Sequence, residues 1–369
     1  MPVNEERIRE RFLQLVRLNS PSKKEGAVAE WLKEQFAQLS LAAEVDDSAK
    51  ETGSETGNII VRLEGEGPTL LLAAHMDVVS DMAGVQVLEE DGVFRTDGRT
   101  ILGADDKAGI AAILEAATVL VEEKLPHPSL ELVFTTCEEI GLFGAKHLKR
   151  ESLKAQYGFI FDSMNQPGEI IVNSPSQDEH YYKVLGKAAH AASAEEGVSA
   201  IQIAAWAISQ IPLGRLSPST TANIGKISGG TATNIVPELA EIWGEVRSFQ
   251  DEELEKQSRL MEDSFQKAAA KFGGSVEGKK ERSFTGFQLS HKDSVVQLAQ
   301  NAVHKVGLRS QLVSSGGGSD ANVFNQLGIP SVNLGVGMEK PHTKEEFLAA
   351  RDLVAAAEIA LALCTGEAR

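Results

Sequence analysis

The chain has 369 residues, of which 42% are hydrophobic, and a formal net charge of −17. That length and apolar content are sufficient for two domains with buried cores. Nucleic acids and anionic membranes attract basic surfaces, so the negative charge argues against both as partners.

Two helices are predicted at the start of the chain. NEERIRERFLQLVRL and EGAVAEWLKEQFAQL carry apolar residues at three- and four-residue spacing, and the SPS between them is expected to break the first helix and cap the second. The charged start lacks the apolar core of a signal peptide, and no apolar run reaches the roughly 20 residues needed to cross a bilayer. The two cysteines, Cys137 and Cys364, cannot build a disulfide framework. We therefore expect a soluble, cytoplasmic protein.

A buried strand is predicted in LLLAAHMD, which brings a histidine and a carboxylate to its end. Imidazole is a good zinc ligand, and a metal-bound histidine usually hands its other ring nitrogen to an orienting neighbour. His75 and Asp77 therefore form a candidate metal site. The alternative is a satisfied polar pair at the end of a strand.

GADDKAG, which contains Asp105 and Asp106, opens the next predicted helix. It follows a predicted hairpin, VQVLEEDGVFRT, whose Asp91-Gly92 pair is a turn signal. Acidic residues are favourable at the start of a helix without any ligand. Adjacent carboxylates repel each other, however, and a divalent cation is a common reason to bring them together.

Further ligand-type residues follow later strands. LVFTTCEEIG brings a β-rich run to Glu138 and Glu139, and YGFIFD ends another strand at Asp162. His342 lies in MEKPHTKEEF, just before the last amphipathic helix. Each group has an ordinary structural explanation when it is taken alone. Because sites in open α/β sheets form at the carboxyl ends of strands, we predict that these groups converge.

A glycine-rich run, SSGGGSDANVF, precedes a helix in the way that a phosphate cradle does. The dinucleotide fingerprint G-x-G-x-x-G after a strand is absent, and so is G-x-x-x-x-G-K-[ST]. Nucleotide binding is therefore not expected. Between about Asp178 and Thr285 no metal-type motif occurs, and the order strand-helix-strand-strand-helix-strand is similar to the ferredoxin-like motif.

In order and approximate spacing, LLLAAHMD, GADDKAG, TTCEEIG, FIFD and PHTKEEF resemble the five metal-site motifs of the co-catalytic zinc exopeptidases. This family includes peptidase T, glutamate carboxypeptidase and acetylornithine deacetylase. The residues of the motifs are most similar to those of the peptidase T-like, or aminotripeptidase, branch. The resemblance spans nearly the whole chain. It implies an α/β zinc-exopeptidase (phosphorylase/hydrolase-like) fold, in which helices sandwich a mixed sheet. A catalytic domain of residues 1–178 and 286–369 would be interrupted by an α+β ferredoxin-like lid at 179–285.

The same resemblance implies two zinc ions, with cobalt or manganese as alternatives. Their implied ligands are His75 and Asp162 on one ion, Glu139 and His342 on the other, and Asp105 between them. The Asp105–Asp106 peptide is commonly cis in relatives. Asp77 would orient His75, and Glu138 would be the general base that takes a proton from a metal-activated water.

In the inserted domain the resemblance implies three substrate-binding residues. His190, in GKAAHAAS, would stabilise the oxyanion, often from a partner subunit. Asn234, in SGGTATNIVPE, would meet the substrate. Arg247, in GEVRSF, would hold a substrate carboxylate, with a structural salt bridge as its alternative. Relatives occur both as monomers and as dimers through the lid, so a homodimer is one of two expectations.

The function implied is a dinuclear zinc aminopeptidase that removes the N-terminal residue of short peptides, tripeptides above all. An aspartate at position 162 accompanies aminopeptidase-type members of the family. One alternative keeps the metal site but acts as a carboxypeptidase or an N-acyl amino acid amidohydrolase. A non-catalytic metal-binding scaffold on the same fold is the other.

Overall fold

A computed structural model describes residues 3–366 of the chain. The chain divides into two compact units, each with its own hydrophobic core. The larger unit contains the chain up to Asn173, Gln288–Ser315 and the chain from Ser319 on. The smaller unit comprises Ser174–Phe287 and Gly316–Gly318, limits that lie a few residues outside the insert expected at 179–285.

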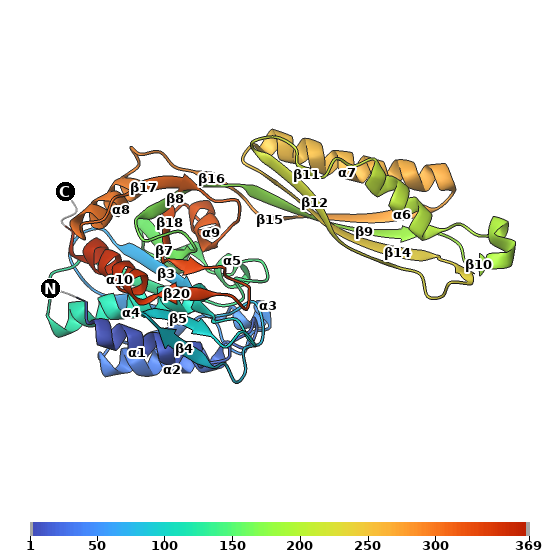
Figure 1. The fold of residues 1–369 in the computed structure, drawn as a ribbon. Coiled ribbons are helices and arrows are strands. Elements are labelled where there is room, and N and C mark those ends of the chain that lie inside the picture. The colour runs from blue at the N-terminus through green and yellow to red at the C-terminus, as the bar shows by residue number, and fades with distance from the viewer. Residues whose placement is uncertain (1–2, 367–369) are drawn as a thin grey trace. The chain divides into compact units, whose positions relative to one another are not determined.

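The larger unit is built on a mixed sheet of nine strands within the described part of the chain (Figure 1). In spatial order the strands are β1 (Ala43–Val45), β2 (Ile59–Leu63), β6 (Leu130–Thr135), β3 (Leu70–His75), β7 (Tyr157–Ser163), β18 (Ser331–Gly335), β8 (Glu169–Ser174) and β16 (Phe287–Gln288), and β17 (Gln311–Ser314) pairs with β8. The central strands β6, β3, β7 and β18 run parallel to one another. Their carboxyl ends therefore share one edge of the sheet, where sites form in α/β proteins.

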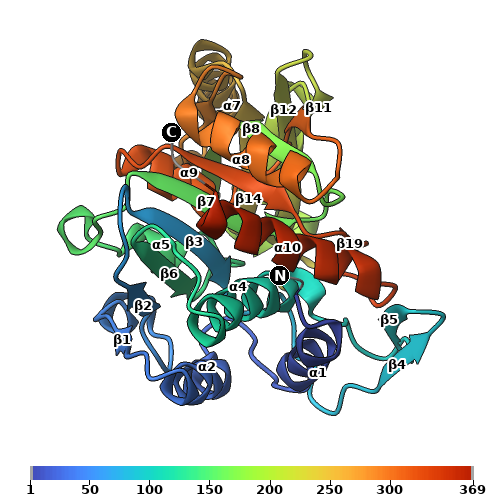
Figure 2. The ribbon, with the colours of Figure 1, turned by 90° about the vertical axis from the view of Figure 1, so that its left-hand side faces the viewer.

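Helices cover both faces of this sheet (Figure 2). One core joins alternate strand residues such as Leu70, Leu72 and Ala74 to five helices. Those helices are α1 (Glu5–Val16), α2 (Gly26–Gln38), α4 (Ala104–Glu122), α8 (Ser294–Lys305) and α10 (Ala350–Thr365). The opposite face meets α9 (Asp320–Gln326), which packs on β7 and β18 and contacts α5 (Phe143–Lys146). Because both faces are covered, the strands read as nearly continuous apolar runs.

A smaller four-stranded sheet joins distant parts of the larger unit. Its order is β19 (Met338–Glu339), β20 (Phe347–Ala349), β5 (Val93–Thr96) and β4 (Val87–Glu90). The predicted hairpin is present between β4 and β5, and Asp91 and Gly92 both have positive φ, as a two-residue type I′ hairpin turn requires. Pairing of β20 with β5 places the His342 loop next to the start of α4. The short elements α3 (Ala49–Thr52) and the 3₁₀ helix η1 (Arg150–Ser152) complete the unit.

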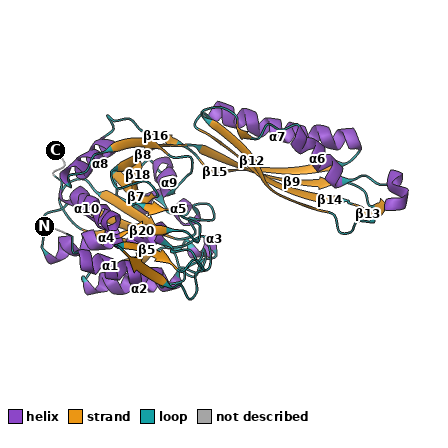
Figure 3. Ribbon diagram, in the orientation of Figure 1, coloured by secondary structure: helices purple, strands orange, loops and turns teal. Residues whose placement is uncertain are grey.

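The smaller unit is a sheet with both long helices on one face (Figure 3). Its strands, in spatial order, are β11 (Gly214–Arg215), β12 (Thr220–Gly229), β14 (Leu239–Ser248), β9 (Ser176–Leu185) and β15 (Ser275–Phe284). The helices are α6 (Ala200–Ser209) and α7 (Asp251–Phe272). Two short strands, β10 (Ala189–His190) and β13 (Ile235–Val236), pair with each other beside the 3₁₀ helix η2 (Ala191–Glu196). The order of β15, β9, β14 and β12 is that of the ferredoxin-like motif.

The expected fold class is confirmed, but one local prediction is wrong. SPS does not cap α2, whose N-cap is Glu25, without a side-chain hydrogen bond to the helix. Ser20 and Ser22 donate instead to Met76 O and Asp77 Oδ2 beyond the end of β3. These contacts are favoured over helix capping because the buried oxygens of Met76 and Asp77 need hydrogen-bond donors. Among the described residues, no helix has both the length and the apolar content to span a bilayer.

Candidate metal and catalytic site

The predicted ligands of the larger unit meet at the carboxyl edge of its sheet. His75 ends β3, opposite Thr135 at the end of β6. Ala73 pairs with Ile160 of β7, so two residues further along His75 and Asp162 lie side by side. The distance between His75 Nε2 and Asp162 Oδ1 is 3.6 Å. Parallel register therefore brings together two residues that are 87 positions apart in sequence.

Asp105 lies between two histidines. Its Oδ1 is 3.1 Å from His75 Nε2, and its Oδ2 is 3.1 Å from His342 Nε2. His342 Nε2 is also 3.1 Å from Oε1 of Glu139. The two oxygens of one carboxylate thus face two different imidazoles, one from a strand end and one from the loop between β19 and β20. This is the arrangement that a carboxylate shared by two cations needs.

Asp106 has a different environment from its neighbour. Its Oδ2 accepts a hydrogen bond from the backbone N–H of His75, and its Oδ1 accepts one from Gly109 N–H. The peptide between Asp105 and Asp106 is cis, as the resemblance implies. Asp106 also lies within ligand distance of His75 and Asp162. We assign it a structural role, because backbone donors already occupy both of its oxygens.

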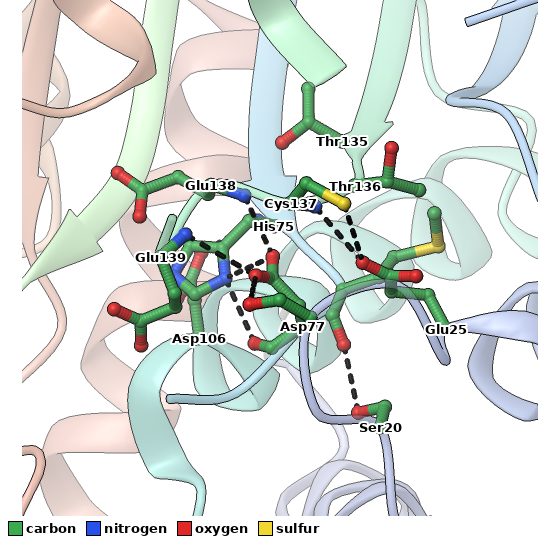
Figure 4. Close-up of polar contacts among 12 residues, drawn as sticks. Ser20, Glu25, His75, Asp77, Asp106, Thr135, Thr136, Cys137, Glu138 and Glu139 are labelled. Atoms are coloured by element: carbon green, nitrogen blue, oxygen red, sulfur yellow. Dashed lines mark hydrogen bonds and ion pairs between the residues drawn. The ribbon is translucent and has the colours of Figure 1, made fainter. Parts of the chain in front are cut away.

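The turn that carries Glu138 and Glu139 is held by Asp77 (Figure 4). Asp77 Oδ1 accepts a hydrogen bond from Glu138 N–H at 2.9 Å, and Oδ2 accepts one from Glu139 N–H at 3.2 Å. His75 Nδ1 lies 3.0 Å from the backbone carbonyl of Asp77 and 3.5 Å from its Oδ1. The backbone of Asp77 therefore orients the imidazole, while its side chain fixes the glutamate turn. In Figure 4 the carboxylates of Glu138 and Glu139 both point away from Cys137.

Negative charge is in excess at the site. Burial raises the pKa of Asp162 to about 7, against the opposing effect of His75. Burial, followed by the charges of Asp162 and other acids, raises the pKa of Glu138 well above its usual range. Hydrogen bonds to Asp105 and Glu139 raise the pKa of His342 to about 10. Several carboxylates and only two imidazoles share a low-dielectric space, where such shifts are expected.

These residues fit divalent metal ions. His75, Asp105 and Glu139 offer one ligand atom each within 4.8 Å of one another, and so do His75, Asp106 and Asp162. Within residues 3–366, Oε1 of Glu139 is buried and accepts no hydrogen bond of good geometry. Nitrogen and oxygen donors of this kind suit zinc and its neighbours in the periodic table.

Comparison with known proteins agrees with this geometry. Residues 71–365 match the model of peptidase family M20/M25/M40, which covers most of the chain. The chain belongs to this family. The resemblance seen in the motifs is thereby confirmed, and the chain is a peptidase.

Three relatives show how close the similarity is. The chain is 45% identical to an uncharacterized protein, YqjE, of Bacillus subtilis over 364 residues, with 98% of each chain covered. It is 41% identical to the aminopeptidase PepT of Bacillus cereus, with a TM-score of 0.89 and 98% of each chain covered. It is 40% identical to a tripeptidase of Staphylococcus aureus, with a TM-score of 0.94 and 99% of each chain covered.

Two residues near the site of this M20/M25/M40 peptidase were missed in the sequence. Glu346, four residues after His342, accepts hydrogen bonds from Leu102, Gly103 and Asp105 N–H, so it fixes the start of α4. Asp320, from the glycine-rich run, accepts from Thr135 Oγ1 at 2.5 Å, and burial raises its pKa to about 6. Asp and Glu are rarely fully buried without a partner, but burial is not visible in a loop sequence.

The three predicted substrate-binding residues lie in the smaller unit of the peptidase, at two opposite ends. His190 and Asn234 are neighbours, because β10 pairs with β13 and Ala191 N–H donates to Asn234 O. Arg247 lies near the far end of β14, where its guanidinium contacts Glu245 and the carbonyl of Gly316. Eight residues of strand separate Arg247 from the Leu239 end of β14, which corresponds to roughly 25 Å.

Proposed function

We propose that this peptidase is a metal-dependent aminopeptidase that removes the N-terminal residue from short peptides, tripeptides above all. The observation that carries the proposal is the placement of Asp105, with one oxygen toward His75 and the other toward His342. Solved relatives at 40% and 41% identity are named as a tripeptidase and an aminopeptidase, which supports the choice of substrate end.

Five side chains would hold two metal ions, for which zinc is the proposed identity. His75 and Asp162 would hold one ion, Glu139 and His342 the other, and Asp105 both. Their mutual distances and burial support this division. When bound, such ions polarise a peptide carbonyl and lower the pKa of water toward about 7.

Glu138 is proposed as the general base. Among the described residues no donor or cation occupies its carboxylate, whereas Glu139 faces His342. Burial raises the pKa of Glu138, which makes it a stronger base than an exposed glutamate. Its backbone N–H is fixed by Asp77, so the carboxylate can take a proton from water and return it to the leaving amine without moving the turn.

Blocking the peptide amino group tests the proposed substrate end. We expect free tripeptides to be cleaved and their N-acetylated forms to be cleaved at least about 100-fold more slowly, because acetylation removes the charge of the amino group and adds bulk at the end where an aminopeptidase binds it. The measurement is kcat/KM for matched pairs such as Leu-Gly-Gly and N-acetyl-Leu-Gly-Gly. Preferential hydrolysis of the acetylated peptide would instead favour the alternative, a carboxypeptidase or an N-acyl amino acid amidohydrolase, and the released product would separate these two. Inactivity on both, with two ions bound, would favour a scaffold.

We further propose that a homodimer completes the substrate site. An extended tripeptide spans only about 10 Å, whereas His190 and Asn234 are separated from Arg247 by roughly 25 Å of strand. A single smaller unit therefore cannot bring all three residues to one tripeptide. Two chains satisfy this geometry if each offers a different end of its smaller unit. A surface for such a contact is available on β12, which pairs with β14 along one side and with β11 over only two residues on the other, and whose Ile227 is exposed.

Mixed dimers test the sharing of sites. Co-expression of Glu138→Ala and His190→Ala chains should restore about a quarter of the parent activity, although each variant alone is inactive. Half of the randomly formed dimers then contain one site with both residues intact. Differently tagged chains allow the mixed dimer to be purified before assay. No recovery in purified mixed dimers would mean that His190 acts on the site of its own chain.

A cytoplasmic location is proposed as well. Cys137 and Cys364 are both free and buried, which suits a reducing compartment.

A further inference from the structure

The turn after β6 is held by side chains that come from far away in the sequence. Four consecutive backbone N–H groups, from Thr136 to Glu139, each donate to a side-chain oxygen. The acceptors are Asn58 Oδ1 for Thr136, Glu25 Oε1 for Cys137, Asp77 Oδ1 for Glu138 and Asp77 Oδ2 for Glu139. Figure 4 shows Glu25 beside the N–H of Cys137 and Asp77 beside the next two N–H groups of the turn.

The backbone explains why the turn needs these acceptors. Cys137 has a φ of +54°, in the left-handed region that a residue with a Cβ adopts only at a cost of about 1 kcal/mol or more. This conformation turns successive N–H groups toward one side, which creates an anion-binding concavity. Because Cys137 is fully buried, water cannot replace a lost acceptor. The carboxylates therefore stabilise the conformation that aims Glu138 and Glu139.

Glu25 is fully buried, and its oxygens accept hydrogen bonds from backbone N–H groups, from a hydroxyl and, at 3.4 Å, from the thiol of Cys137. Oε1 accepts from Cys137 N–H at 3.0 Å and from Lys23 N–H at 2.9 Å, while Oε2 accepts from Ser54 Oγ. Within residues 3–366 no lysine or arginine forms an ion pair with it. Burying a carboxylate without an ion-pair partner is costly, so the hydrogen bonds that Glu25 accepts must offset that cost.

The segment around Glu25 makes two more contacts at the same place. Ser22 Oγ donates to Asp77 Oδ2 at 2.6 Å, and Ser20 Oγ donates to Met76 O at 2.9 Å. Ser22 thereby fixes the carboxylate that in turn holds Glu138 and Glu139. The whole segment lies before residue 71, where the family match begins.

We propose that Glu25 is a positioning residue for catalysis, which holds the turn of Glu138 and Glu139 by accepting the Cys137 N–H. This inference rests on the proposed function, because it assigns Glu138 the role of base. Glu25 is not among the residues proposed to bind substrate or metal. It acts through the backbone of Cys137, and Ser22 supports the neighbouring acceptor, Asp77.

Two substitutions of Glu25 distinguish the effect of losing its hydrogen-bond acceptor from the effect of losing its negative charge. Glu25→Gln keeps an oxygen for Cys137 and Lys23 N–H, and its amide nitrogen can donate to Ser54 Oγ. Glu25→Ala removes the acceptor. We expect kcat to fall about 10- to 100-fold in Glu25→Ala, with KM and bound metal close to those of the parent, and to stay within about threefold in Glu25→Gln.

Glu131, on the strand β6 that leads into the turn, provides a control. It is buried on β6, and its carboxylate accepts hydrogen bonds from Lys154 and Ala155 N–H at the end of the strand away from the site. Unlike Glu25, it also contacts a guanidinium, that of Arg62, at 3.4 Å. Glu131→Ala should lower the melting temperature as much as Glu25→Ala does, because both leave buried N–H groups unsatisfied. Its kcat should remain that of the parent.

Amide hydrogen exchange gives a readout that does not depend on activity. In Glu25→Ala the N–H groups of Cys137 and Glu138 should exchange faster than in the parent, whereas in Glu131→Ala they should not. Parent kcat in a folded Glu25→Ala chain, or unchanged exchange in the turn, would overturn the inference. So would a Glu25→Gln variant as slow as Glu25→Ala. A parent without peptidase activity would reject the proposed function, and the exchange comparison would still decide the role of Glu25.

Discussion

Glu138→Ala should abolish peptide hydrolysis and leave the metal content of the chain unchanged. A general base contributes about 10²- to 10⁴-fold to rate, and Glu138 is the carboxylate proposed for that role. Asp77 binds the N–H of residue 138, a contact that the substitution preserves. The measurements are kcat on a tripeptide and metal per chain by elemental analysis.

Glu139→Ala is the matched comparison for this experiment. Glu139 follows Glu138 on the same turn and is similarly buried, but its Oε1 faces His342. The Glu139→Ala variant should lose about one ion per chain as well as its activity. If Glu138→Ala lost metal while Glu139→Ala kept it, the roles of the two glutamates would be reversed.

Asp105→Ala should have the largest effect on metal binding. Both of its oxygens face histidines at 3.1 Å, so its removal takes a ligand from each of the two proposed ions. We expect bound metal to fall from two ions to fewer than one per chain, and kcat/KM to fall by at least about 10³-fold. Calorimetric titration of the metal-free chain with Zn²⁺ measures the stoichiometry directly.

Asp106→Asn is the control for Asp105. Asp106 is adjacent and fully buried, but its oxygens accept His75 and Gly109 N–H. The variant should therefore bind two ions and lose only thermal stability. Two ions retained in Asp105→Ala, with metal lost from Asp106→Asn, would transfer the ligand role to Asp106.

The exact use of each polar group depended on contacts that local sequence does not encode. Asp77 was expected to orient His75, and its carbonyl faces the imidazole, while its carboxylate accepts the two N–H groups of the glutamate turn as well. Ser22 had the position of a helix cap, yet its hydroxyl serves Asp77. Each of these side chains could form a hydrogen bond with several chemically equivalent groups. Which of those bonds forms is decided by the distant segment that packs beside the side chain.

Strands, helices and ligand-type residues were readable from the sequence because hydrophobic period, turn residues and motif spacing are local properties. The order of motifs was enough to identify the family, the resemblance implied a catalytic domain interrupted by an insert, and the alternation of strands and helices indicated the fold of that insert. The tertiary structure decided which donors meet which acceptors: that Glu25 holds Cys137, that Asp105 faces two histidines, and that Arg247 lies a strand's length from His190. These outcomes depend on strand register and on the burial of polar groups, which arise only when segments far apart in the chain pack together.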